Sequence, residues 1–265
     1  MLIAWGIYLV LGVAAGIMAG LLGIGGGLIL VVALVWLLPT QGVPAGDAMH
    51  VALATSLASI VLTGLSSARA HHARGSVLWR SVAWLVPGML LGGLLGAAVA
   101  TALSGEALRW FVCGFCVLAA LQLLFGQPRA GGDRTDAPAS PGLTAAGVGI
   151  GAVSAVVGIG GGSMTVPLLV WLGVAPVRAV GTSSACGVAI AVASAIGYMG
   201  LGPAPGVLPA GSVGYVYVPA AVGIALTSIL AAPYGTRLAH HIRPQTLKRV
   251  FAAFLLAVAL SLLLK

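Results

Sequence analysis

The chain has 265 residues, of which 60% are hydrophobic and 6% are charged, and its formal net charge is +8. Soluble domains carry about 25% charged residues, so this composition excludes an ordinary water-soluble protein. Apolar runs of about 20 residues, the length that spans a bilayer, recur from end to end. The alternation typical of an outer-membrane barrel is absent. We therefore expect an all-α polytopic membrane protein, whose basic residues mark cytoplasmic loops rather than a nucleic-acid surface.

The first half of the chain predicts five helical segments. The first segment ends at the string GIGGG (23–27), which should interrupt a helix because each glycine costs about 1 kcal/mol relative to alanine. A short apolar piece follows the string directly, and three longer helices come after it. The expected ranges are 1–22, 27–38, 48–68, 79–101 and 107–125.

A linker at 126–142, rich in proline, glycine and charge, separates this half from the next. The string GIGGG returns at 158–162, again inside an apolar segment. The piece after it is about 16 Å long, too short to cross a bilayer alone, so we expect a broken helical hairpin or a re-entrant segment. The expected ranges are 143–157, 163–173, 177–199, 213–233 and 246–264.

The two halves, residues 1–125 and 143–265, are predicted to be copies of one transmembrane repeat. The strings around both GIGGG motifs align at a constant offset, and VALATSLAS in the first half aligns with RAVGTSSAC in the second. We also expect Pro87 to pair with Pro219, each inside a long helix.

The basic residues predict the orientation of the repeats. Loop 69–80 carries arginines whereas its counterpart, 200–212, has no charge; in the next pair, 102–106 lacks Lys and Arg whereas 234–249 is basic. By the positive-inside rule, equivalent loops then face opposite sides, which indicates inverted-topology repeats. We expect 69–80, 234–249 and the linker 126–142 in the cytoplasm, with both termini outside.

Inverted repeats with broken helices are typical of secondary transporters, whose binding site lies near the membrane midplane. A new half-helix should begin after each glycine string, and helix N-termini bind anions through free N–H groups and a partial positive charge. The two breaks could therefore aim two sets of donors at one central site. The alternative is that these glycines only permit close helix packing.

All four acidic residues fall in predicted loops or helix ends, whereas cation carriers commonly place carboxylates at membrane depth. Hydroxyls are available instead, and they donate to an oxyanion without adding charge. Each hydroxyl could alternatively bond to a carbonyl of its own helix. The predicted substrate-binding residues are Gly25, Gly26, Gly27, Thr55, Ser56, Gly160, Gly161, Gly162, Ser163, Thr165, Thr182 and Ser183.

Two ionisable residues near helix starts are candidates for coupling or access. Arg178 could guide an anion inward or anchor its helix at the interface, and His50 could couple transport to protons. The simpler interpretation is that Asp47 caps this helix and His50 is solvated. We expect no catalytic residue, metal or cofactor. Cys113 and Cys116 share a helical face, so a redox pair is an alternative to small buried packing residues.

The two GIGGG strings, VPLLVWLGV and GTSS resemble the TauE/SafE family of sulfite and organosulfonate exporters. The resemblance covers nearly the whole chain, and implies secondary transport of anions such as sulfite, sulfonates or sulfoacetate across the bacterial inner membrane. The first half departs at LILVVAL, which lacks the Ser, Thr and Pro of SMTVPLL, so the second half is expected to supply more side-chain donors. The family motifs carry over to Gly23, Gly25, Gly26, Gly27, Gly158, Gly160, Gly161, Gly162, Thr182 and Ser183.

The function expected from these features is secondary transport of a small oxyanion by alternating access of the two halves, and not an enzymatic reaction. A passive anion channel would use the same donors, and a membrane redox or assembly protein is a third hypothesis. The expected partners are a small anionic substrate and membrane lipid, with no nucleic acid and with a homodimer left open.

Overall fold

The computed structural model describes residues 2–22, 26–125, 138–239 and 244–264. The expectation of an all-α polytopic membrane protein is confirmed, because six helices in these ranges are long and apolar enough to cross a membrane. They are α1 (Leu2–Leu22), α3 (Ala48–Ala73), α4 (Trp79–Ala102), α5 (Gly105–Phe125), α8 (Pro176–Gly200) and α9 (Val218–Ala239). The shorter elements are α2 (Gly27–Leu37), η1 (Leu38–Gln41), α6 (Pro141–Val157), α7 (Gly162–Trp171), β1 (Ser212–Val213), β2 (Val216–Tyr217) and α10 (Pro244–Leu263).

Parts of three predicted features lie outside the described residues. They are Gly23 and Gly25 of the first glycine string, residues 126–137 of the linker, and residues 240–243 of the predicted basic loop 234–249.

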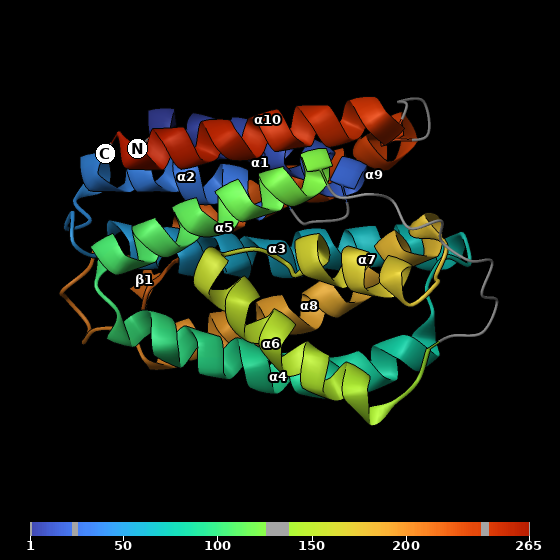
Figure 1. The fold of residues 1–265 in the computed structure, drawn as a ribbon. Coiled ribbons are helices and arrows are strands. Elements are labelled where there is room, and N and C mark those ends of the chain that lie inside the picture. The colour runs from blue at the N-terminus through green and yellow to red at the C-terminus, as the bar shows by residue number, and fades with distance from the viewer. Residues whose placement is uncertain (1, 23–25, 126–137, 240–243, 265) are drawn as a thin grey trace.

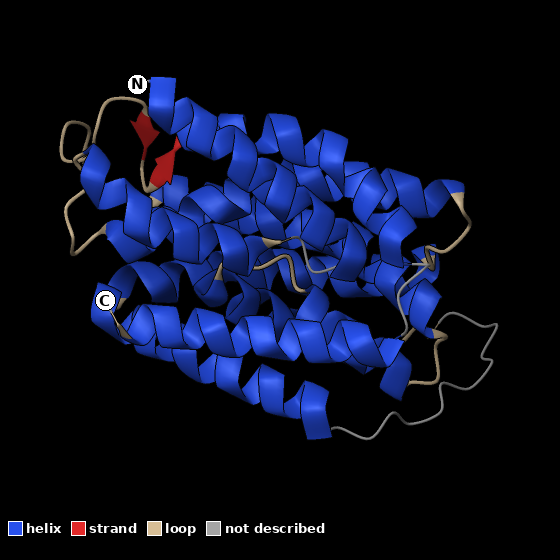
Figure 2. Ribbon diagram, turned by 90° about the horizontal axis from the view of Figure 1, so that it is seen from above, coloured by secondary structure: helices blue, strands red, loops and turns tan. Residues whose placement is uncertain are grey.

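The described chain is almost entirely helical apart from the short ribbon β1–β2 (Figure 2). The helices of the two predicted repeats interleave (Figure 1). Helix α1 packs along α9, α4 packs along α6, and α5 packs along α10. The central contact joins α3 to α8. In the predicted repeats, helices α1, α3, α4 and α5 of the first half correspond to α6, α8, α9 and α10 of the second. The α1–α9 contact therefore corresponds to the α6–α4 contact, whereas the α3–α8 and α5–α10 contacts each join two corresponding helices.

Helices α3 and α8 form the centre of the molecule and are the most buried of the six membrane-length helices. Most of the buried polar side chains lie on these two helices. Their hydroxyls therefore face other parts of the protein rather than the surface. The buried hydroxyls of α3 and α8 belong to Thr55, Ser56, Ser59, Thr63, Ser67, Thr182, Ser183, Ser184 and Ser194.

Glycines on α4 allow α6 to approach closely. Gly88, Gly92 and Gly96 are spaced by four residues and share one helical face. A β-carbon on Gly92 would lie 2.1 Å from the carbonyl oxygen of Val148 on α6, and the other two glycines are as tightly placed. These glycines thus act as small residues that bring membrane helices into contact.

The start of α9 differs from the prediction. The helix begins at Val218 rather than at 213, because the residues before it pair as the antiparallel ribbon β1–β2. Pro219 therefore lies in the first turn of α9, where proline is tolerated, whereas Pro87 lies inside α4. The expected equivalence of these two prolines is wrong. The other predicted helices agree to within a few residues, with α3 extending to Ala73.

The close contact between α4 and α6 predicts opposite effects for two Gly→Ala variants. Gly92→Ala should lower the free energy of unfolding by about 1–3 kcal/mol, because its β-carbon overlaps a backbone carbonyl. Gly149→Ala on α6 is the control, since no atom lies within 4 Å of its β-carbon; it should raise the stability by about 0.5–1 kcal/mol. Thermal unfolding in detergent measures both, and equal effects would contradict the packing account.

Candidate functional site

The two glycine breaks meet between the halves. Gly26 (φ 64°) immediately precedes α2, and Gly161 (φ 75°) immediately precedes α7. A new helix therefore begins at the last glycine of each string, one residue earlier than a start directly after the string. Gly26 and Gly161 have left-handed backbone conformations that glycine adopts at little cost. A β-carbon on Gly27 would lie only 2.3 Å from the carbonyl oxygen of Gly158. The first residue of α2 is therefore in direct contact with the end of α6.

Ser56 on α3 joins the two breaks. Its hydroxyl lies 3.1 Å from the carbonyl oxygen of Gly27 and 3.1 Å from that of Gly158, and the side chain is fully buried. A hydroxyl has one proton to donate, so the two carbonyls share it. This predicted site residue therefore holds the crossing of the two breaks together.

Three buried hydroxyl oxygens beside the second break, and a fourth on the neighbouring helix α8, have no hydrogen-bond partner among the described residues. Ser163 and Thr165 lie in the first turn of α7, and Ser154 precedes the break, with its Oγ 3.4 Å from the position of a β-carbon on Gly161. The fourth, Ser183, lies one turn before Gly187 on α8. Buried polar groups are nearly always hydrogen-bonded, so free donors at a helix N-terminus suit a ligand rich in acceptors.

The first break lacks this set of hydroxyls. At the offset that aligns the two glycine strings, Ala19, Leu28 and Leu30 occupy the positions of the three hydroxyl residues around the second break. All three are buried, and Leu28 and Leu30 belong to the main apolar cluster. The available side-chain donors are therefore concentrated in the second half.

Thr55 and Thr182, which align in the two halves, make a different kind of contact from the free hydroxyls. The oxygen of Thr55 accepts a hydrogen bond of 3.0 Å from the backbone N–H of Tyr217. The oxygen of Thr182 accepts one of 3.0 Å from the backbone N–H of Leu78. Both bonds lead to the opposite half, in contrast to Ser184, which donates to the carbonyl of its own helix at Val180.

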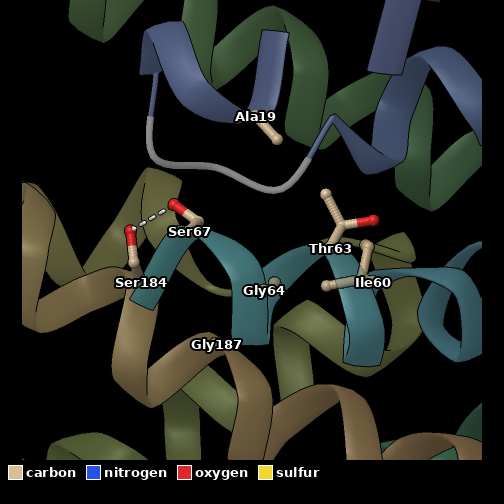
Figure 3. A pocket seen from close by; sticks show the side chains of 8 residues that line it. Ala19, Ile60, Thr63, Gly64, Ser67, Ser184 and Gly187 are labelled. Atoms are coloured by element: carbon tan, nitrogen blue, oxygen red, sulfur yellow. Dashed lines mark hydrogen bonds between the residues drawn. The ribbon is translucent and has the colours of Figure 1, made fainter. Parts of the chain in front are cut away.

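A small cavity of about 20 Å³, with room for about one water molecule, lies between α1, α3 and α8 and reaches the second break at Gly160 (Figure 3). Its polar lining comes from Thr63 and Ser67 on α3 and from Ser184 on α8, and the last two are hydrogen-bonded at 3.3 Å. Gly187 also lines the cavity, and its β-carbon would lie 2.5 Å from the carbonyl oxygen of Gly160. The cavity therefore borders both halves.

Three polar residues of this region were not predicted from the sequence. Thr63 and Ser67 continue a series of hydroxyls on α3 that begins at Ser56 and includes Ser59, with spacings of three or four residues. Such spacing places side chains on one helical face, which is the signal that could have identified them. Ser154 has no comparable signal, because its proximity to the break depends on how α6 ends.

The ionisable candidates lie away from the breaks. Asp47 makes no side-chain cap, so the capping prediction is wrong. His50 is buried rather than solvated: its Nε2 donates to the carbonyl oxygen of Leu103 at 3.0 Å, and its ring stacks on Tyr215 at 5.0 Å. Burial and then the negative charge of Asp47 raise the pKa of Tyr215, which keeps this phenol neutral. Arg178 lies in the first turn of α8.

The cysteines of α5 are packing residues. Cys113 and Cys116 are buried, and the Sγ of Cys113 lies 3.6 Å from the carbonyl oxygen of Ala259 on α10. Among the described residues, no group of three His, Cys, Asp or Glu side chains could hold a metal ion.

A family model described as "Sulfite exporter TauE/SafE" matches residues 8–262. The chain belongs to the TauE/SafE family. A "Probable membrane transporter protein" of Haemophilus influenzae is 36% identical to it over 97% of both chains. The "Probable membrane transporter protein YunE" of Bacillus subtilis is 31% identical over 67% of this chain and 71% of its own. No solved structure was found to match.

Membership of the TauE/SafE family and the names of these relatives support a membrane transporter. For this TauE/SafE member, we consider the contact between the halves, where Ser56 joins the two breaks and the cavity reaches Gly160. The four unpartnered hydroxyls do not line this cavity.

The different environments of two aligned serines predict different effects on stability. Ser56→Ala should lower the free energy of unfolding by about 1–3 kcal/mol, because two buried carbonyls lose their shared donor. Ser183→Ala should leave the stability unchanged or slightly higher, because it removes a buried hydroxyl without a partner. Thermal unfolding of both variants tests this contrast, and an equal loss would show that Ser183 is a structural residue.

Proposed function

We propose that this TauE/SafE protein is a secondary transporter of a small sulfur-containing oxyanion of the sulfite or sulfonate type. The anion binds at the second glycine break, and the two halves alternately expose it to the two sides of the membrane. The observation that carries the proposal is that hydroxyls flanking the second break in the chain are buried without a hydrogen-bond partner among the described residues, as is Ser183 on the neighbouring helix α8.

The chemistry of this group favours an anion. The N-terminus of a helix carries about half a positive charge and unpaired N–H donors, and the hydroxyls add donors without adding charge. A metal cation would require oxygen ligands that supply negative charge, and the buried side chains of the described residues include no carboxylate. Glycine at the break keeps the backbone free of side chains, so that N–H groups can approach the ligand.

The paired contacts between the halves support alternating access. The cavity lies between α3 and α8, and each of the remaining main contacts between the halves has a counterpart. The outer helices can therefore move relative to the α3–α8 centre in two equivalent directions, which is the behaviour expected of inverted repeats.

The proposed orientation follows from the two ends of the bundle. The turn between α3 and α4 lies at the end opposite the ribbon β1–β2 (Figure 1). Arg74 lies in that turn, with Arg69 and Arg80 in the flanking helix turns. We assign this basic end to the cytoplasmic side of the bacterial inner membrane, by the positive-inside rule.

The proposed site predicts which variants lose transport. In proteoliposomes, Ser183→Ala and Thr165→Val should each lower the initial uptake of labelled sulfite by about tenfold or more at low substrate concentration, since each removes a hydrogen bond to a charged ligand. Ser59→Ala is the control, because its hydroxyl donates only to the carbonyl of Ser56 in the same helix. Normal uptake by both site variants would place the anion elsewhere.

The same vesicles separate a carrier from a channel. Preloaded unlabelled sulfite should accelerate the entry of labelled sulfite. The reason is that the binding site of a carrier returns to the outer side of the vesicle faster when it holds an anion than when it is empty. Entry that does not respond to preloading would favour the passive channel.

Binding predicts a selective gain in thermal stability. Sulfite and short alkyl sulfonates should raise the unfolding temperature of the purified protein in proportion to the logarithm of concentration above the dissociation constant. Acetate tests selectivity among anions, and choline chloride controls for ionic strength. Stabilisation by choline chloride as large as that by sulfite would contradict an anion site.

A further inference from the structure

The Thr182 hydroxyl joins the two halves at the end of the bundle that contains the α3–α4 turn. Leu78, whose N–H donates to it, is the N-cap residue of α4, and such N–H groups have no partner within their own helix. Thr182 is fully buried, and a β-carbon on the preceding Gly181 would lie 2.7 Å from the carbonyl oxygen of Ser76. Helix α8 therefore lies directly against the turn that leads into α4.

The Thr55 hydroxyl makes the corresponding contact at the opposite end. Tyr217, whose N–H donates to it, is the residue immediately before α9. The ribbon is also held to α8, because the N–H of Tyr215 donates to the carbonyl oxygen of Tyr198 at 3.1 Å. The stacking of Tyr215 on His50 adds a contact to α3. The start of α9 is therefore fixed to both central helices.

The two contacts are counterparts. Thr55 and Thr182 align in the repeats, and each binds the residue that immediately precedes a long helix of the other half, α9 or α4. These long helices in turn pack along α1 and α6. The turn before α4 and the ribbon before α9 lie at opposite ends of the bundle (Figure 1). Loss of one bond would therefore weaken the attachment of one helix pair to the α3–α8 centre at one end only.

We propose that Thr55 and Thr182 are gate residues, each of which holds one end of the transport path closed. This inference rests on the proposed alternating access, but it does not depend on which anion is carried. A single neutral hydrogen bond changes a two-state equilibrium by about two- to tenfold. Each bond is thus weak enough to break in every cycle and strong enough to bias which end is open.

The test uses one reporter cysteine at each end. The native cysteines are replaced by alanine, and either Ser76→Cys or Val216→Cys is introduced, since both side chains are buried beside a gate contact. Thr182→Val should increase the rate of maleimide labelling at the Ser76 reporter by about two- to tenfold, without an increase at the Val216 reporter. Thr55→Val should give the reverse pattern. Purified protein in detergent exposes both ends to the reagent, so no assumption about orientation is needed.

Serine variants separate the hydrogen bond from the loss of a side chain. Thr55→Ser and Thr182→Ser keep the hydroxyl and should label as the parent protein does. Equal labelling of both reporters in each valine variant, or no change in either, would overturn the gate proposal. Opposite labelling patterns without sulfite uptake would support the gates while rejecting the proposed substrate. Sulfite uptake with unchanged labelling would support the proposed substrate and reject the gates.

Discussion

The constraint on which the structure depends is the fate of backbone groups where helices are interrupted inside a membrane. Hydrocarbon offers no hydrogen bonds, so non-helical backbone is tolerated only where protein or water meets it. The chain satisfies this requirement by bringing the two breaks into contact and by placing the Ser56 hydroxyl between the carbonyls of Gly27 and Gly158. The interleaved helices enclose this contact, so the buried backbone of Gly27 and Gly158 lies where lipid cannot reach it.

The helix contacts between the two halves are symmetric, whereas the side chains at the centre are not. Helix pairs recur when the halves are exchanged, and Thr55 and Thr182 make corresponding contacts. The side chains at the breaks differ, however, because leucines follow the first glycine string where Ser163 and Thr165 follow the second. Symmetric contacts suit a movement with two equivalent directions, whereas an asymmetric group of donors suits a single bound ligand. The symmetric contacts and the asymmetric donors can differ in this way because they belong to different residues.

Much of the fold could be predicted from the sequence, since membrane helices are marked by long apolar runs and glycine strings mark the breaks. The start of α9 was misplaced, because the ribbon before it depends on pairing between residues with no helical pattern. The site was harder to predict. The bonds of Thr55 and Thr182 go to backbone N–H groups far away in the chain, and neither composition nor spacing reveals such partners. Periodic hydroxyls on α3 would have revealed Thr63 and Ser67.

The interleaving of α1 with α9 has a consequence for biosynthesis. A ribosome delivers α1 to the bilayer first, whereas the helix that covers its glycines arrives only after nearly all of the remaining helices. Until then, lipid must solvate the surface around Gly12 and Gly16 that later presses against α9. The native arrangement can therefore close only late in translation, and neither half can acquire its final neighbours by itself.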